Sequence, residues 1–212
     1  DRTIPTAGLD EQGLAELDCG EDRTYQLKLD ENDTLLLLNA AGQPVKALPA
    51  ARNDDEKPLV ADAKKQLSTA RKELKQAVAA QTERLYEAMC LERRWAVEDW
   101  RRHLLAHPIV SRLLRKLVWM AHDAEGHRMF LFRPLDDGSF SDVEDGEVTL
   151  DDVATVQLAH SSLVDADDAA GWRSHLPDYE VMPPFEQFAD DLPSLPETAA
   201  TDLSIDDRKG WM

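Results

Sequence analysis

Alternating apolar and polar residues predict a short β-meander in the first part of the chain, residues 1–50. Tyr25, Leu27 and Leu29 are separated by polar residues, which is the period-two spacing of a half-buried strand. A turn cluster follows, and residues 34–38 then give a second strand that is more fully apolar. We therefore expect two or three strands in this region.

A different period begins at Pro58 and continues to about Cys90, where apolar residues recur mostly every three or four positions. This pattern predicts one amphipathic helix of roughly 32 residues, about 48 Å long. Because a long solitary helix is marginal in water, we expect other helices to pack against it. Residues 96–106 and a stretch from Pro108 to about Met120 are the predicted partners. Residues 57–121 thus form a predicted three-helix unit with one long helix.

Period-two spacing returns after this unit, so residues 122–188 predict a β-rich part with a short helix. The candidate strands begin near Met129 and at residues 148–150 and 154–158. A run of acidic residues starts the short helix, which continues to about His175.

Residues 189–212 are rich in proline and acidic residues. They predict an extended acidic tail. Residues 206–212 are predicted to begin a helix that is truncated. Taken together, the elements predict an α+β fold. It has an N-terminal β-meander, a three-helix unit with one long helix, and a C-terminal β-rich part with a short helix.

The charge of the chain is unevenly distributed. Its 24 Lys and Arg residues and 42 Asp and Glu residues give a net charge of −18, which argues against non-specific binding to nucleic acid or anionic lipid. Residues 57–120 nevertheless carry a net charge of +7, between flanks of −8 and −17. Either the acidic flanks compensate this basic block within the fold, which we favour, or the block offers a surface to an anionic partner.

The sequence predicts a cytoplasmic protein. Its longest apolar run, Leu35–Leu38, is far shorter than the roughly 20 residues that span a bilayer. The first residues lack the architecture of a signal peptide. Two cysteines, Cys19 and Cys90, do not make a disulfide framework, so a reducing compartment is expected.

Four histidines are the candidates for a metal site. His103 and His107 are four residues apart on a predicted helix, a spacing that can chelate zinc, but the glutamate of a zinc-protease helix is absent between them. His122 and His127 could add ligands if the fold brought them near. Because a His before a Pro at a helix junction more often bonds a backbone group, we expect neither a metal nor another cofactor.

Three further motifs carry weaker chemical signals. Cys90 lies close to two arginines that could lower its pKa, but its place beside the apolar stripe favours a buried, inert thiol. His160 precedes two serines, yet adjacent residues on a strand face opposite sides, and no nucleophile elbow is present. The acidic loop at residues 136–145 lacks the alternation of a calcium-binding loop. We therefore assign no catalytic residue.

Tryptophans and arginines are interleaved in the helical unit. Such interleaving can bind single-stranded nucleic acid, but Trp95, Trp100 and Trp119 fall near the predicted apolar faces, so we interpret them as core residues. The neighbouring arginines are better candidates for docking an acidic protein surface: Arg101, Arg102, Arg112 and Arg115.

Several motifs, in the order in which they occur, resemble a known bacterial family. They lie at residues 4–10, 86–95, 100–119, 158–160 and 179–188. In this order they resemble the uncharacterised MolR-like family of large bacterial proteins, some of which carry a WGR module. The block at 100–119 and the Pro-Phe-Glu-Gln segment are the most specific parts.

The resemblance implies that this chain is an interior segment of a larger protein with a link to molybdate-related regulation. It brings no established catalytic residues. A WGR module would suggest a nucleic-acid context, but the chain has no Trp-Gly-Arg core.

These observations favour a non-enzymatic protein-interaction or regulatory module within a larger bacterial protein. Its expected partner is another protein or other parts of the same full-length chain, whereas a membrane or a nucleic acid is not expected. The alternative is a ligand- or metal-binding domain, which could be an enzyme. Its site would lie between the helical and C-terminal parts and would be lined by His107, His122, His127 and His160.

Overall fold

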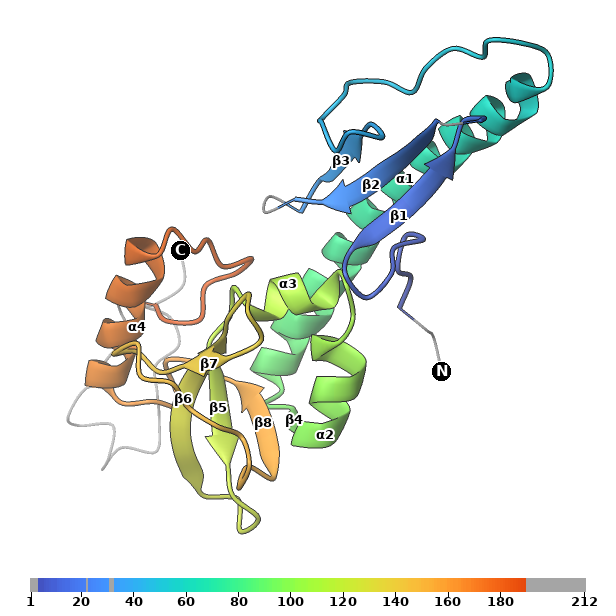
Figure 1. Ribbon diagram of the computed structural model, residues 1–212. Helices are drawn as coiled ribbons and strands as arrows, with labels where there is room; N and C mark the ends of the chain where they lie inside the picture. The colour runs from blue at the N-terminus through green and yellow to red at the C-terminus, as the bar shows by residue number, and fades with distance from the viewer. Residues whose placement is uncertain (1–3, 22, 31–32, 190–212) are drawn as a thin grey trace, which may run out of the picture.

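The long helix α1 (Glu56–Cys90) connects two antiparallel sheets in the computed structural model (Figure 1). The structure describes residues 4–21, 23–30 and 33–189. The apolar stripe of α1 is buried along almost its whole length, from Val60 to Met89. Its first half packs against the N-terminal sheet and its second half against the C-terminal one. The predicted long helix is therefore confirmed.

The N-terminal sheet has three antiparallel strands in the order β1-β2-β3. They are β1 (Leu14–Asp18), β2 (Thr24–Leu29) and β3 (Leu35–Leu38), of which β2 and β3 follow the predicted pattern. Alternate leucines of the strands, such as Leu27 and Leu37, are buried against α1. The predicted meander is confirmed.

A buried ion pair fixes the start of α1 to the β1–β2 hairpin. Arg23 Nη1 lies 2.8 Å from Glu56 Oε2, and both side chains are more than nine-tenths buried. The same carboxylate oxygen accepts the Arg52 backbone N–H, and Arg23 also donates to the Ala50 carbonyl. Gly20 closes the hairpin at a φ of +113°, where an added Cβ would lie 2.7 Å from the Glu56 side chain, so the turn requires glycine.

The segment after α1 differs most from prediction. It contains β4 (Arg94–Ala96), α2 (Val97–Trp100), a π-helical turn η1 (Arg101–Leu105) and α3 (Val110–Leu114). The third helix ends well before Met120, because residues 119–122 form strand β5 (Trp119–His122). Every residue from Leu117 to His122 is buried, and a short, fully buried strand has the same apolar appearance as a buried helix.

The C-terminal sheet has five strands in the order β4-β8-β5-β6-β7. It adds β6 (Arg128–Pro134), β7 (Phe140–Ser141) and β8 (Thr155–Leu158) to β4 and β5. The strand predicted at 148–150 is wrong, since these residues form no strand and an isolated bridge lies just before them, at Glu147. The sheet takes strands from both sides of the division expected at residue 121.

Helices cover both faces of this sheet (Figure 1). Trp119 and Phe132 point toward α2, where their rings lie 5.1 Å and 6.0 Å from that of Trp100. Their strand neighbours point the other way, toward Trp172 of α4 (Ala166–Asp178). The predicted short helix and the core position of Trp100 and Trp119 are confirmed. The α+β fold is therefore as expected, whereas the predicted tail beyond residue 189 and its helix at 206–212 lie outside the described residues.

Buried Gln187 fastens the segment after α4 to the sheet. Its Oε1 accepts the Val118 N–H at 2.8 Å. Its Nε2 donates to the carbonyls of Val118 and Ala159, at 2.9 and 2.8 Å. One side chain thus satisfies three backbone groups between strands, which a buried site requires.

Replacing Glu56 with Ala should lower the free energy of unfolding by about 3–5 kcal/mol, because Arg23 then stays buried without its counter-ion. The control is Asp54→Ala, which removes the exposed partner of Lys57 and should cost less than about 1 kcal/mol. Urea denaturation followed by circular dichroism measures both. Equal losses in the two variants would contradict the importance of the buried pair.

Replacing Gln187 with Leu should lower the free energy of unfolding by about 2–3 kcal/mol, because it leaves buried backbone groups without partners. The matched control is Gln76→Leu on the exposed face of α1, with an expected change below about 0.5 kcal/mol. Urea denaturation followed by circular dichroism measures the free energy of unfolding of both variants. A Gln187→Leu protein as stable as the parent would show that the segment is held by its apolar contacts instead.

Candidate functional site

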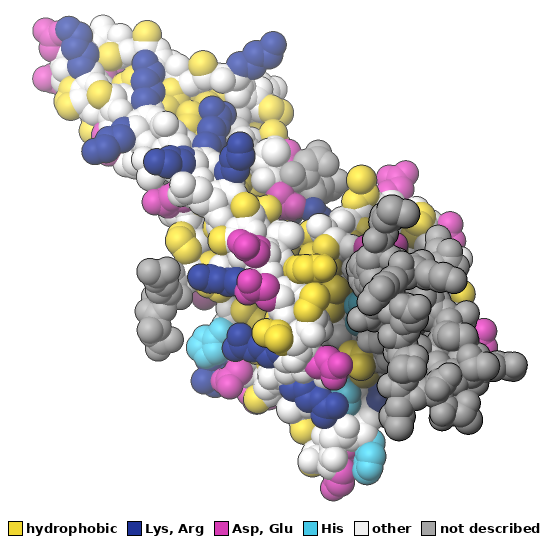
Figure 2. Space-filling model, turned by 180° about the vertical axis from the view of Figure 1, so that it is seen from behind, with side chains coloured by type: hydrophobic (Ala, Val, Ile, Leu, Met, Phe, Trp, Pro, Cys, Tyr) yellow, Lys and Arg dark blue, Asp and Glu magenta, His cyan; other side chains and the backbone are white. Residues whose placement is uncertain are grey.

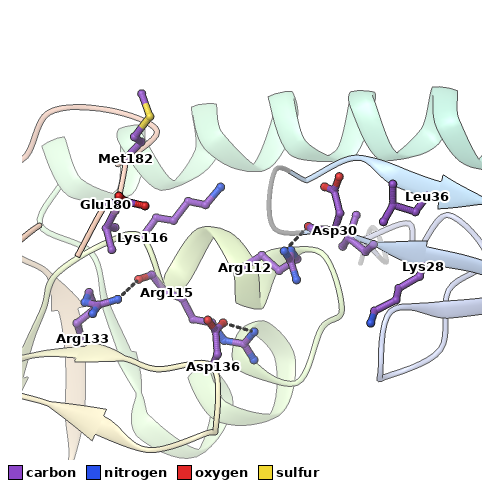
Figure 3. A pocket seen from close by; sticks show the side chains of 12 residues that line it. Lys28, Asp30, Leu36, Arg112, Arg115, Lys116, Arg133, Asp136, Glu180 and Met182 are labelled. Carbon is purple, nitrogen blue, oxygen red and sulfur yellow. Dashed lines mark hydrogen bonds and ion pairs between the residues drawn. The ribbon is translucent and has the colours of Figure 1, made fainter. Parts of the chain in front are cut away.

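A cleft of about 910 Å³ lies where the N-terminal sheet, α3 and the C-terminal sheet meet (Figure 3). Its walls come from the end of β2, from β3, from α3 and the turn after it, from β6, and from the segment after α4. Three of the lining residues are acidic and five are basic. The basic ones are Lys28, Arg112, Arg115, Lys116 and Arg133. We call this the cationic cleft.

Two of these cations hold the N-terminal sheet against α3. Arg112 and Lys116 are four residues apart, so both reach the carboxylate of Asp33 at the β2–β3 turn. The Arg112 Nε to Asp33 Oδ1 distance is 3.0 Å, and Arg112 also donates to the Asp30 carbonyl. Part of the basic block is therefore compensated within the fold, as the sequence analysis favoured.

Arg115 is less completely engaged. Its Nη1 lies 3.2 Å from Asp136 Oδ1, but the Asp136 side chain is 94% exposed, so solvent screens this pair. The Arg115 Nε is buried and has no hydrogen-bond partner within the described part of the chain.

Arg133 is the most unusual cation of the cleft. It lies on β6 and is only 8% exposed, yet among the described residues it forms no ion pair. Its Nη1 donates to the Arg115 carbonyl at 3.3 Å, and its Nε has no partner. Burial lowers the pKa of Arg133, and the charges of Asp136 and Asp145 partly oppose this shift.

A second cavity of about 580 Å³ extends the cleft past Arg133 toward Tyr179. The Arg133 guanidinium lies 5.9 Å from the centre of the Tyr179 ring. The Tyr179 hydroxyl donates to Asp145 Oδ2 at 2.6 Å, and this hydrogen bond raises the pKa of Tyr179. Exposed apolar side chains, Leu36 and Met182, also line the cleft, so it combines cations with apolar contact area.

The structure separates the four arginines that we expected to form one interaction surface. Arg112 and Arg115 line the cleft, whereas Arg101 and Arg102 lie on the π-helical turn and do not. The Arg101 guanidinium lies 5.8 Å from the centre of the Phe140 ring, and Arg102 is exposed.

The histidines proposed as metal ligands occupy separate environments. His103 is exposed on the π-helical turn. His107 Nδ1 accepts the N–H groups of Ile109 and Val110, so its Nε2 carries the proton and points to the Ile4 carbonyl 3.3 Å away. Burial lowers the pKa of His107, consistent with a neutral ring.

The other two candidate ligands lie on and after β5. His122 is buried, and this burial, with help from Arg94, lowers its pKa. His127 is exposed and contacts Asp123 at 3.3 Å. Within the described ranges, no group of three or more His, Cys, Asp or Glu side chains could hold a metal ion.

The weaker motifs are likewise dispersed. His160 Nδ1 lies 2.8 Å from the hydroxyl of Ser162. Cys90, expected to be buried, is exposed, because it lies one residue past the buried stripe that ends at Met89. None of the helices in the part of the chain that the structure describes has the length and apolar character needed to cross a membrane.

Lys28, Arg133 and Met182 were not among the site residues expected from the sequence. Arg133 did carry a usable signal, because it follows the four consecutive apolar residues of β6, 129–132, on a buried stretch of the strand. Lys28 and Met182 carry none, since their role depends on a cleft formed by segments far apart in the sequence.

Comparison with known proteins gives the chain a family. Residues 42–205, which include α1 and all the elements that follow it, match the model of a domain of unknown function, DUF4132. The chain belongs to the DUF4132 family. It is also 28% identical, over 191 residues, to the uncharacterized protein YehI of Escherichia coli strain K12. That alignment covers 89% of this chain but only 16% of YehI. No solved structure matches this DUF4132 chain.

Proposed function

We propose that this chain is a non-enzymatic interaction module of a longer bacterial protein, and that its cationic cleft receives a carboxylate-rich segment. The segment belongs to another protein or to another part of the same polypeptide. The observation that supports this proposal most strongly is the gathering of five basic side chains around one cleft in a chain of net charge −18.

Electrostatics favour such a contact over non-specific adhesion. The net charge of −18 repels most anions at long range, whereas the recessed cations raise the local potential in the cleft. The apolar side chains of Leu36 and Met182 at the same site would contact aliphatic groups of the segment. Charge selects the partner, and buried apolar area adds to the affinity.

The wider context belongs to the same proposal. The match to only 16% of YehI supports a module within a longer protein. The MolR-like resemblance supports a regulatory role, and two free cysteines support a reducing, cytoplasmic location.

The proposal predicts that a fluorescein-labelled peptide of alternating Asp and Glu binds this chain, and that added salt weakens the binding. The double variant Lys28→Glu, Arg115→Gln should lower the affinity at least about tenfold, because it removes two cleft cations. Fluorescence anisotropy measures the dissociation constants.

Lys72→Glu is the control, because Lys72 is exposed on α1 and does not line the cleft. In the view from behind, Lys and Arg side chains are scattered over the part of the molecule that holds the N-terminal sheet and the first half of α1 (Figure 2). The control should change the affinity less than about twofold. No binding at low salt, or equal losses in both variants, would refute the cleft as the docking site.

A further inference from the structure

Arg133 is a buried cation that forms no ion pair with any described residue. The residue is more than nine-tenths buried, and its hydrogen bond goes to a neutral carbonyl, that of Arg115. Proteins almost never bury a charged group without pairing it, since desolvation costs several kcal/mol. An anion that enters the cleft would supply the missing counter-charge.

A second arginine, Arg115, lines the same two cavities as Arg133. The hydrogen bond from Arg133 Nη1 to the Arg115 carbonyl fixes the Arg133 side chain to the backbone of Arg115, while the Arg115 guanidinium extends toward Asp136 (Figure 3). Each has a buried Nε without a partner, while its Nη1 is already engaged. The Nε and Nη2 atoms form one edge of the guanidinium, and this edge is the fork that binds planar or tetrahedral oxyanions.

The charges favour a dianion over a single carboxylate. Arg133 has no ion-pair partner among the described residues, and the partner of Arg115 is the almost fully exposed Asp136, which can turn into solvent. Carboxylates also line these cavities, at Asp136, Asp137, Asp145 and Glu180, and the charges of Asp136 and Asp145 partly compensate Arg133. A bound anion must therefore compete with single carboxylates that are already present, which favours a ligand of higher charge. A phosphate monoester carries a charge of about −1.5 to −2 and three strong acceptor oxygens, enough for both guanidinium groups.

We propose that Arg115 and Arg133 form a phosphoryl-binding subsite within the cationic cleft, and that the acidic segment bound there carries a phosphorylated side chain. This inference rests on the proposed docking function and names the group that anchors the partner. Tyr179 lines the second cavity together with both arginines, and its hydroxyl donates to Asp145. Lys28 also lines the cleft, where carboxylates of the same segment would lie.

The test compares three acidic peptides of one sequence, with Ser, phosphoserine or Glu at the central position. Titration calorimetry on the unmodified chain should give the phosphoserine peptide an affinity at least about tenfold above the Ser peptide and clearly above the Glu peptide. Inorganic phosphate should displace the phosphoserine peptide more effectively than chloride at the same ionic strength.

Variants locate the subsite. Arg133→Gln and, independently, Arg115→Gln should abolish the preference for phosphoserine, and Arg133→Lys should weaken it because the fork is lost. Arg102→Gln is the control, since Arg102 is exposed outside the cleft. Thermal unfolding checks that each variant is folded. If the Arg133→Gln variant is unfolded, the Arg115→Gln variant alone decides whether the subsite exists.

The outcomes separate the two proposals. Equal binding of the phosphoserine and Glu peptides would overturn the phosphoryl subsite while leaving the docking function intact. Failure of all three peptides to bind would overturn both. A phosphoserine preference that survives in both arginine variants would also reject this subsite.

Discussion

One buried cation, Arg133, joins the turn after α3 to the C-terminal sheet beside the cleft. Its guanidinium occupies a buried position near the end of β6, where an apolar side chain would carry no desolvation penalty. From there it donates to the Arg115 carbonyl and so holds the turn after α3 against the C-terminal sheet. Because Arg112 and Lys116 lie on that same turn and helix, this contact also places the two cations that reach Asp33.

The remaining architecture serves to bring distant segments to this point. α1 carries both sheets on one apolar stripe, and the Arg23–Glu56 pair secures its first turn to the N-terminal hairpin. Gln187 returns the segment after α4 to the sheet. Residues 28, 112, 115, 116, 133 and 180–182 can then line one cleft, although more than 150 positions separate the first from the last.

Periodicity predicted the parts of this fold that are long or only half buried. α1 and β2 show a clear apolar face with the helical and the strand period that the sequence predicted. β3 and α4 were predicted from a short apolar run after a turn and from an acidic helix start. The sequence did not predict β4 and β5. A three-residue strand such as β4 is too short to show a pattern, and residues 117–122, which include β5, are all buried. The cleft could not be predicted, because arginines that are close in the sequence are not the ones that line the same cavity. Arg101 contacts the Phe140 ring, whereas the distant Arg133 lines the cleft.

The most direct evidence would come from the position of a bound oxyanion. A crystal of this chain soaked in tungstate, an electron-dense analogue of phosphate, locates the anion by anomalous scattering. The unsatisfied guanidinium groups predict a peak within hydrogen-bond distance of both Arg115 and Arg133. An empty cleft, with tungstate only on the exposed lysines of α1, would contradict the idea that the buried cation awaits an anionic partner.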